Sequence, residues 1–319
     1  MRSAFAIALV LAVLLPLPWL VHSDFWTNLA IMALYYGFLG QAWNLLGGYG
    51  GQFSFGHAAF FGTGAYASAV LQVSLGLNPW LCLALAAAAG TLTGALIGAL
   101  SFRYGLRGSY FALVTLAFAE VFRILADSLG FTGAGVGILI PLKESAANFQ
   151  FASKAGFYLV ILALNALGLA CAWWIENSRF GARLLALREN EDAARALGVD
   201  VFRTKLAAIT LSGALTALGG SFYAQYFLYI DPAIAYGPGV SVEALLVPIV
   251  GGLGTLFGPL LGAAALQLLN QLASAVMGEA PGLNLVLYGA VLVLMIMFMP
   301  QGLFGLARLS SRRLAGRAG

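Results

Sequence analysis

The sequence predicts an all-α membrane protein, a polytopic transmembrane helix bundle with about ten spans and two glycine-rich helix breaks. Of the 319 residues, 61% are hydrophobic and only 9% are charged, whereas soluble domains are about 45–50% apolar and about 25% charged. Residues 25–102 contain no Asp, Glu, Lys or Arg. Because a bilayer core takes about 20 helical residues, that stretch alone is long enough for about three spans. These observations exclude a soluble globular protein and a disordered chain.

Ten apolar runs are the predicted spans, and they lie at 4–21, 27–46, 58–76, 80–101, 110–126, 156–175, 206–228, 240–252, 258–276 and 283–303. The first run resembles a signal peptide, but the residues before Asp24 form a poor cleavage site. We therefore expect an uncleaved first span. The run at 240–252 is short for a crossing, so it is either a half-helix or a tilted short span. The whole chain, 1–319, is predicted to form a single transmembrane domain.

The basic residues predict the orientation of the chain. If the N-terminus is inside and all ten runs cross, 13 of the 16 Lys and Arg residues lie on the cytoplasmic side. This bias is typical of multi-span proteins, and it predicts that both termini are cytoplasmic. The net charge of +4 does not indicate a nucleic-acid partner, because the cations lie between apolar spans rather than on a folded face.

Two glycine clusters, at 47–57 and 251–259, interrupt the apolar runs. Both begin Gly-Gly-x-Gly, close with Phe-Gly and lead into an apolar helix. Non-helical backbone at membrane depth is found where protein or a water-filled cavity satisfies it, and in transporters such breaks mark the translocation pathway. Two ordinary tight turns between helices are the alternative. The candidate pathway residues are Asn44, Gly51, Gln52, Ser54, His57, Gly251, Gly252 and Gly254, together with Glu243.

Glu243 is the lone acid of the short run before the second cluster, and a gating or substrate-ammonium role is one interpretation of it.

Glu120, Arg123 and Asp127 lie at helical spacing in another predicted helix and share one helical face. For these residues we expect an ion pair between Glu120 and Arg123 near the outer membrane surface.

The sequence shows no motif for catalysis. His22 and His57 are the only histidines, and no pair is spaced for a metal ion. None of the three lysines ends a phosphate-binding G-x-x-x-x-G-K-[ST] string. We therefore expect no catalytic residue, no metal site and no cofactor on this chain, so any ATP-driven step requires a separate subunit.

The only long charged stretch is the predicted cytoplasmic loop at 177–205. Within it, Glu189 to Leu197 is rich in helix formers, and Gly198 follows as a helix stop. We expect a short helix along the cytoplasmic surface, and a solvated basic linker that only fixes the topology is the alternative.

Part of this loop resembles a known motif. Asp192-Ala193-Ala194-x-x-x-Gly198 is similar to the EAA loop of ABC importer permeases, with Asp192 at the position of the usual Glu. In that family the loop forms the helix that docks on the ATPase subunit. The resemblance implies an ATPase-coupling loop formed by Arg188, Glu189, Asn190, Glu191, Asp192, Ala193, Ala194 and Gly198.

More widely, the chain resembles the branched-chain amino acid permease family of the LivM type. The matching blocks are WNLLGGY at 43–49 followed by GQFSFGHA at 51–58, LRGSYFALVTLA at 106–117, RENE at 188–191 through Gly198, and VGGLGTLFGP at 250–259. The combination, in this order, is far more specific than any one motif.

The resemblance implies a permease subunit of an ATP-binding cassette importer in the bacterial inner membrane, and not an enzyme. Its partners would be a LivH-type permease, two ABC ATPase subunits that bind the ATP and Mg, and an extracytoplasmic substrate-binding protein. The substrates would be leucine, isoleucine and valine, with urea or short amides as the alternative within the family. The rival from another class is an ion-coupled secondary transporter, which predicts a relay of buried acids or histidines.

Overall fold

The computed structural model describes residues 2–21 and 23–277, together with residues 286, 289, 290, 293, 297, 302 and 303. The helices of the first half are α1 (Arg2–Leu14), α2 (Leu17–Leu20), α3 (Asp24–Asn44), the π-helix η1 (Leu45–Tyr49), α4 (His57–Leu75), α5 (Pro79–Arg103) and α6 (Gly108–Ser128). A loop with the short 3-10 turns η2 (Gly130–Thr132), η3 (Ala134–Val136) and η4 (Ala146–Asn148) and the strand β1 (Ile138–Leu139) follows. The second half has α7 (Lys154–Glu176), α8 (Arg179–Glu189), α9 (Glu191–Ala196), α10 (Val201–Phe227), the strand β2 (Tyr229–Ile230), α11 (Pro232–Tyr236), α12 (Pro238–Gly251) and α13 (Gly258–Met277).

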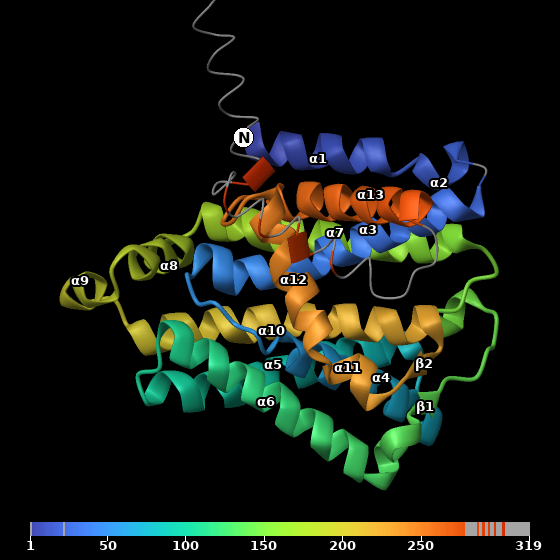
Figure 1. The fold of residues 1–319 in the computed structure, drawn as a ribbon, viewed down its shortest axis with the longest axis horizontal. Helices are drawn as coiled ribbons and strands as arrows, with labels where there is room; N and C mark the ends of the chain where they lie inside the picture. The colour runs from blue at the N-terminus through green and yellow to red at the C-terminus, as the bar shows by residue number, and fades with distance from the viewer. Residues whose placement is uncertain are drawn as a thin grey trace, which may run out of the picture.

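These helices confirm the predicted all-α membrane bundle. Among the described residues, eight helical stretches are long and apolar enough to cross a bilayer, and they match the first eight predicted runs. The 20-residue α13 matches the ninth run, whereas the tenth run, 283–303, lies almost entirely outside the described residues. The short eighth run gains length from α11, so that 232–251 forms one candidate span. In Figure 1, α12 runs steeply across the long helices α3 and α10.

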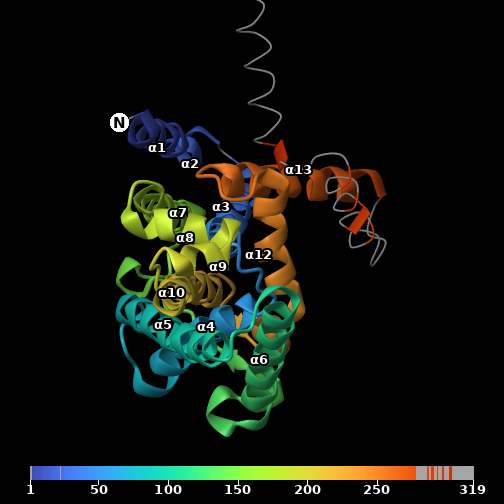
Figure 2. The same ribbon diagram turned by 90° about the vertical axis from the view of Figure 1, so that its left-hand side faces the viewer.

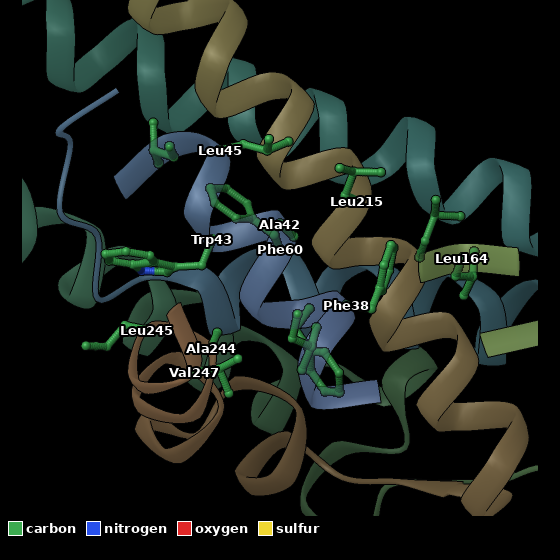
Figure 3. Packing of buried hydrophobic residues seen from close by; sticks show 14 of the residues in the cluster. Phe38, Ala42, Trp43, Leu45, Phe60, Leu164, Leu215, Ala244, Leu245 and Val247 are labelled. Atoms are coloured by element: carbon green, nitrogen blue, oxygen red, sulfur yellow. The ribbon is translucent and has the colours of Figure 1, made fainter. Parts of the chain in front are cut away.

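Helix α3 lies at the centre of the bundle. Every side chain from Gly37 to Asn44 is buried, which is possible because the surrounding helices cover all sides of this segment. Figure 3 shows Phe38 and Trp43 of α3 among side chains of α4, α10 and α12. The core therefore surrounds the helix that leads into the first glycine break.

Small residues let α4, α5 and α10 approach at backbone distance. A Cβ atom added to Gly90 of α5 would lie 2.4 Å from the carbonyl oxygen of Gly213 in α10, and one added to Gly64 of α4 would lie 2.2 Å from that of Ala217. Gly94 also faces α10, 2.8 Å from the carbonyl oxygen of Ile209 by the same measure. The small-residue spacing on α5 is therefore a packing device, as is usual between membrane helices.

The two ends of the bundle differ. Figure 1 shows α8 and α9 projecting at one end, and the antiparallel pair of β1 and β2 at the other. Seen along the bundle in Figure 2, α6 and α12 lie on the side opposite to α7. The charged loop predicted at 177–205 thus forms a distinct helical projection.

Candidate functional site

The first glycine break is a π-helical turn followed by extended backbone. After η1, residues 50–56 run without helix to the start of α4. Gly51 has a φ of +65°, a conformation that glycine adopts without strain. The Trp43 indole Nε1 donates to the Ser54 carbonyl oxygen at 2.8 Å, which holds the extended segment beside α3. The peptide groups at this break are therefore partly satisfied by side chains of the protein, as backbone within a membrane requires.

The second break is a tight connection between α12 and α13. Gly252 and Gly254 have φ values of +133° and +66°, and the Thr255 hydroxyl donates to the Gly252 carbonyl oxygen at 2.8 Å. A Cβ atom added to Gly251 would lie 1.7 Å from the carbonyl oxygen of Gly258. Larger residues are thus excluded here, because the two helix ends are in backbone contact.

Asn44 joins the two breaks. Its Oδ1 accepts from the Gly254 backbone N–H at 2.8 Å, and its Nδ2 donates to the Thr255 carbonyl oxygen at 3.1 Å. A Cβ atom added to Gly48 would lie 2.7 Å from the Gly254 nitrogen, so the two glycine backbones also touch. The sequence predicted both breaks but not this contact between them.

Arg188, at the end of α8, reaches into the same place. Its Nη1 donates to the Gly48 carbonyl oxygen at 2.7 Å. A Cβ atom added to Gly254 would lie 2.7 Å from that Nη1, and one added to Gly51 would lie 2.9 Å from the Arg188 Cγ. One side chain of the predicted coupling loop therefore contacts both breaks. We call Asn44, Gly48, Arg188, Gly254 and Thr255 the glycine junction.

The predicted coupling helix, Glu189 to Leu197, is wrong in its extent. The structure has two helices, α8 and α9, separated at Asn190. Asn190 has extended backbone, and its Oδ1 accepts from the Ala193 backbone N–H at 3.0 Å, so it caps α9. Gly198 ends the turn with a φ of +84°, as predicted. Ala194 is buried within the chain, whereas Ala193 and Ala196 of α9 and Leu197 directly after it are exposed apolar residues.

Glu191 anchors α9 to the bundle. The Lys205 ammonium nitrogen lies 2.5 Å from the Glu191 Oε2, and the Arg107 guanidinium lies 3.0 Å from its Oε1. The side chains of Glu191 and Lys205 are only 12% and 3% exposed, so this ion pair is better protected from water than an ordinary surface pair. Arg107 also contacts the exposed Asp192. Glu191 was predicted as part of the coupling loop, but its anchoring role was not predicted, because its partners belong to the α5–α6 connection and to α10.

The acid of the candidate pathway, Glu243, lies apart from the glycine junction. It lies eight positions before Gly251 in α12, a helical distance of roughly 12 Å. It lines a cavity of about 290 Å³ together with Tyr35, Tyr36 and Tyr223, and Tyr36 makes a hydrogen bond with the carboxyl group. The acid is therefore not isolated, since aromatic side chains from α3 and α10 surround it.

The remaining polar candidates, Gln52, Ser54 and His57, are buried. His57 is fully buried, and its Nε2 lies 2.9 Å from the Ser212 hydroxyl of α10. Gln52 donates to the Gly50 carbonyl oxygen at 3.2 Å, and the Ser54 hydroxyl accepts from the Gly56 nitrogen at 3.2 Å. These three residues hold the first break in place. Within the described ranges, no group of three His, Cys, Asp or Glu side chains is placed to hold a metal ion.

Comparisons with known proteins agree with this architecture. The family described as branched-chain amino acid transport system / permease component matches residues 25–296. A high-affinity branched-chain amino acid transport system permease protein, LivM of Salmonella typhimurium, is 30% identical over 91% of this chain and 72% of its own. A probable LivH permease of Methanocaldococcus jannaschii is 29% identical over 82% and 85%.

A solved structure shares the fold. It is an inward-facing ABC transporter assigned to the metal-chelate type, which matches 92% of this chain and 96% of its own with a TM-score of 0.50 and 16% identity. The family match covers both glycine breaks and the α8–α9 projection. The chain therefore belongs to the family of branched-chain amino acid transport permease components.

Proposed function

We propose that this chain is the permease subunit of an ATP-binding cassette importer that moves leucine, isoleucine and valine from a binding protein into the cytoplasm. Its partners in this proposal are a LivH-type permease, two ATPase subunits that bind ATP and Mg, and the extracytoplasmic binding protein. The chain forms one permease domain in the bacterial inner membrane with both termini inside. The similarity to LivM over most of the chain supports the substrate class.

The glycine junction is the observation that carries the proposal. An ATP-driven permease must pass movement from a cytoplasmic contact to the membrane-spanning helices. Arg188 belongs to the α8–α9 projection and donates to the Gly48 carbonyl oxygen within the first break. Asn44 then connects the first break to the second. A displacement of α8 by the ATPase would therefore act on both breaks at once.

A second contact runs from the same projection to another helix. Arg107 lies directly before α6 and contacts Glu191 and Asp192 of α9. Movement of α9 would thus also pull on the start of α6. The exposed Ala193 and Ala196 of α9, with Leu197 directly after it, provide the surface that the ATPase would contact.

Glu243 is the proposed pathway acid. A carboxylate among tyrosine rings, as in the cavity of Tyr35, Tyr36 and Tyr223, offers an ammonium group both an opposite charge and aromatic faces. This chemistry suits an amino acid better than urea or an amide, neither of which carries a positive charge.

The test is uptake by the chain reconstituted in liposomes with its partner subunits and its binding protein. We expect uptake of labelled leucine that requires ATP and resists a protonophore. Uptake of urea or a short amide but not of leucine would support the alternative substrate. Leucine uptake without the ATPase subunits, abolished by the protonophore, would instead support the secondary transporter.

A further inference from the structure

Helix α6 carries an ion pair on its outer surface. The Arg123 Nη2 lies 2.6 Å from the Glu120 Oε1, and the Arg123 Nε donates to the Glu120 Oε2 at 2.9 Å. The side chains are 50% exposed for Glu120 and 33% exposed for Arg123. The predicted pair is thus confirmed, but it is open to the surroundings of the bundle rather than enclosed by it.

Exposure of this ion pair to lipid hydrocarbon would be energetically unfavourable. Glu120 precedes the end of α6 at Ser128 by eight residues, or roughly 12 Å of helix, so it lies within the span. Charged groups inside a span normally face a bundle interior or a water-filled cavity, because contact with hydrocarbon costs at least about 2.5 kcal/mol per charge. The exposed groups of Glu120 and Arg123 therefore indicate water or another protein on this face.

The position of α6 in the bundle relates the ion pair to the other proposed parts of the pathway. Helices α6 and α12 lie on the same side of the bundle in Figure 2. The Glu243 cavity is lined partly by α12. Helix α6 also begins beside Arg107, which contacts the coupling loop. The ion pair therefore belongs to a helix that lies on the same side of the bundle as α12 and that begins at the Arg107 contact with α9.

We propose that Glu120 and Arg123 form a binding site for the charged groups of an α-amino acid, in a water-filled passage between this chain and its partner permease. Arg123 would bind the substrate carboxylate through its planar guanidinium group, and Glu120 would bind the ammonium, at a point of the passage separate from the Glu243 cavity. This inference rests on the proposed function, which supplies the amino acid and the partner permease. When the substrate leaves, the two side chains pair with each other again, so no charge is left alone in the membrane.

Water access is tested by cysteine labelling in the assembled transporter. Glu120→Cys is placed in a chain whose native Cys82 and Cys171 are replaced by Ala. The matched control is Leu85→Cys on the far side of the bundle, because Leu85 is also surface-exposed and lies six residues from the outer end of α5. We expect a membrane-impermeant maleimide to label the cysteine at 120, leucine to protect it, and the cysteine at 85 to remain unlabelled. Equally weak labelling of the cysteines at 120 and 85 would contradict the proposal that a water-filled passage reaches residue 120.

Transport kinetics test the ligand. Glu120→Gln and Arg123→Gln should each raise the KM for leucine by about ten- to a hundredfold, the effect of losing one hydrogen bond to a charged group. Arg123→Lys should restore part of the affinity. A wild-type KM in both Gln variants would overturn the site while the proposed function stands. A wild-type transporter that takes up no amino acid would instead overturn the proposed function.

Discussion

Replacement of Arg188 by Gln should uncouple ATP hydrolysis from transport. The change removes the 2.7 Å charge-assisted hydrogen bond to the Gly48 carbonyl oxygen. Such bonds contribute about 1.5–3 kcal/mol, and about 1.4 kcal/mol changes an equilibrium tenfold. We therefore expect the ratio of molecules with α8 joined to the first break to molecules with α8 separated from it to fall by about ten- to a hundredfold.

The assay is uptake per ATP hydrolysed in liposomes that contain the assembled transporter. The ATPase subunits should still co-purify with the Arg188→Gln chain, because the Asn190 cap and the Glu191 ion pairs of α9 remain. Arg188→Lys should give an intermediate ratio, since it keeps the charge but not the planar fork. Arg103→Gln, a charge removal in the last turn of α5, is the control. A wild-type ratio in the Arg188→Gln transporter would refute the role of the glycine junction.

Further substitutions separate crowding from backbone strain and test the pathway and the orientation. Gly51 and Gly76 have similar φ values, +65° and +64°, but an added Cβ atom would meet a neighbour only at Gly51. Gly51→Ala should therefore impair uptake. Gly76→Ala should only lower the stability in thermal unfolding, by about 1–2 kcal/mol of backbone strain. Equal uptake would contradict this difference. Gly198→Val, at a φ of +84°, should weaken co-purification of the ATPase subunits, and normal coupled uptake would argue against the coupling role of α9. Glu243→Gln should raise the KM for leucine, and an unchanged KM would exclude the cavity from the pathway. A reporter active only in the cytoplasm should be silent when inserted near Ser145, and activity there would reverse the orientation.

Local patterns predicted the elements of this protein well. Hydropathy located the spans because a bilayer imposes a fixed length of apolar helix. The repeated glycines located both breaks, since each break requires backbone conformations or close approaches that only glycine permits. The division of the coupling helix at Asn190 was also open to prediction, because Asn is a favoured N-cap whose side chain accepts from a backbone N–H of the first turn, here that of Ala193.

The contacts between distant segments could not be predicted in the same way. The Arg188–Gly48 bond joins residues 140 positions apart, and the Asn44–Gly254 bond joins residues 210 apart. Neither pair leaves a spacing signal in the sequence, because the contact depends on how α3, α8 and α12 pack. The tyrosines near Glu243 belong to α3 and α10. Their position beside this acid could not be predicted either, because it also depends on helix packing.

The backbone contacts among α4, α5 and α10 divide the molecule into a fixed frame and an adjustable face. Gly64 against Ala217 and Gly90 against Gly213 leave no room for a single added methyl group, so these three helices cannot slide past one another during a transport cycle. Helices α6 and α12, on the other side in Figure 2, carry Glu120, Arg123 and Glu243, the charged residues that we propose for the pathway. A change of substrate among relatives can therefore arise through the side chains of α6 and α12, while the glycine-packed frame that sets the fold is kept.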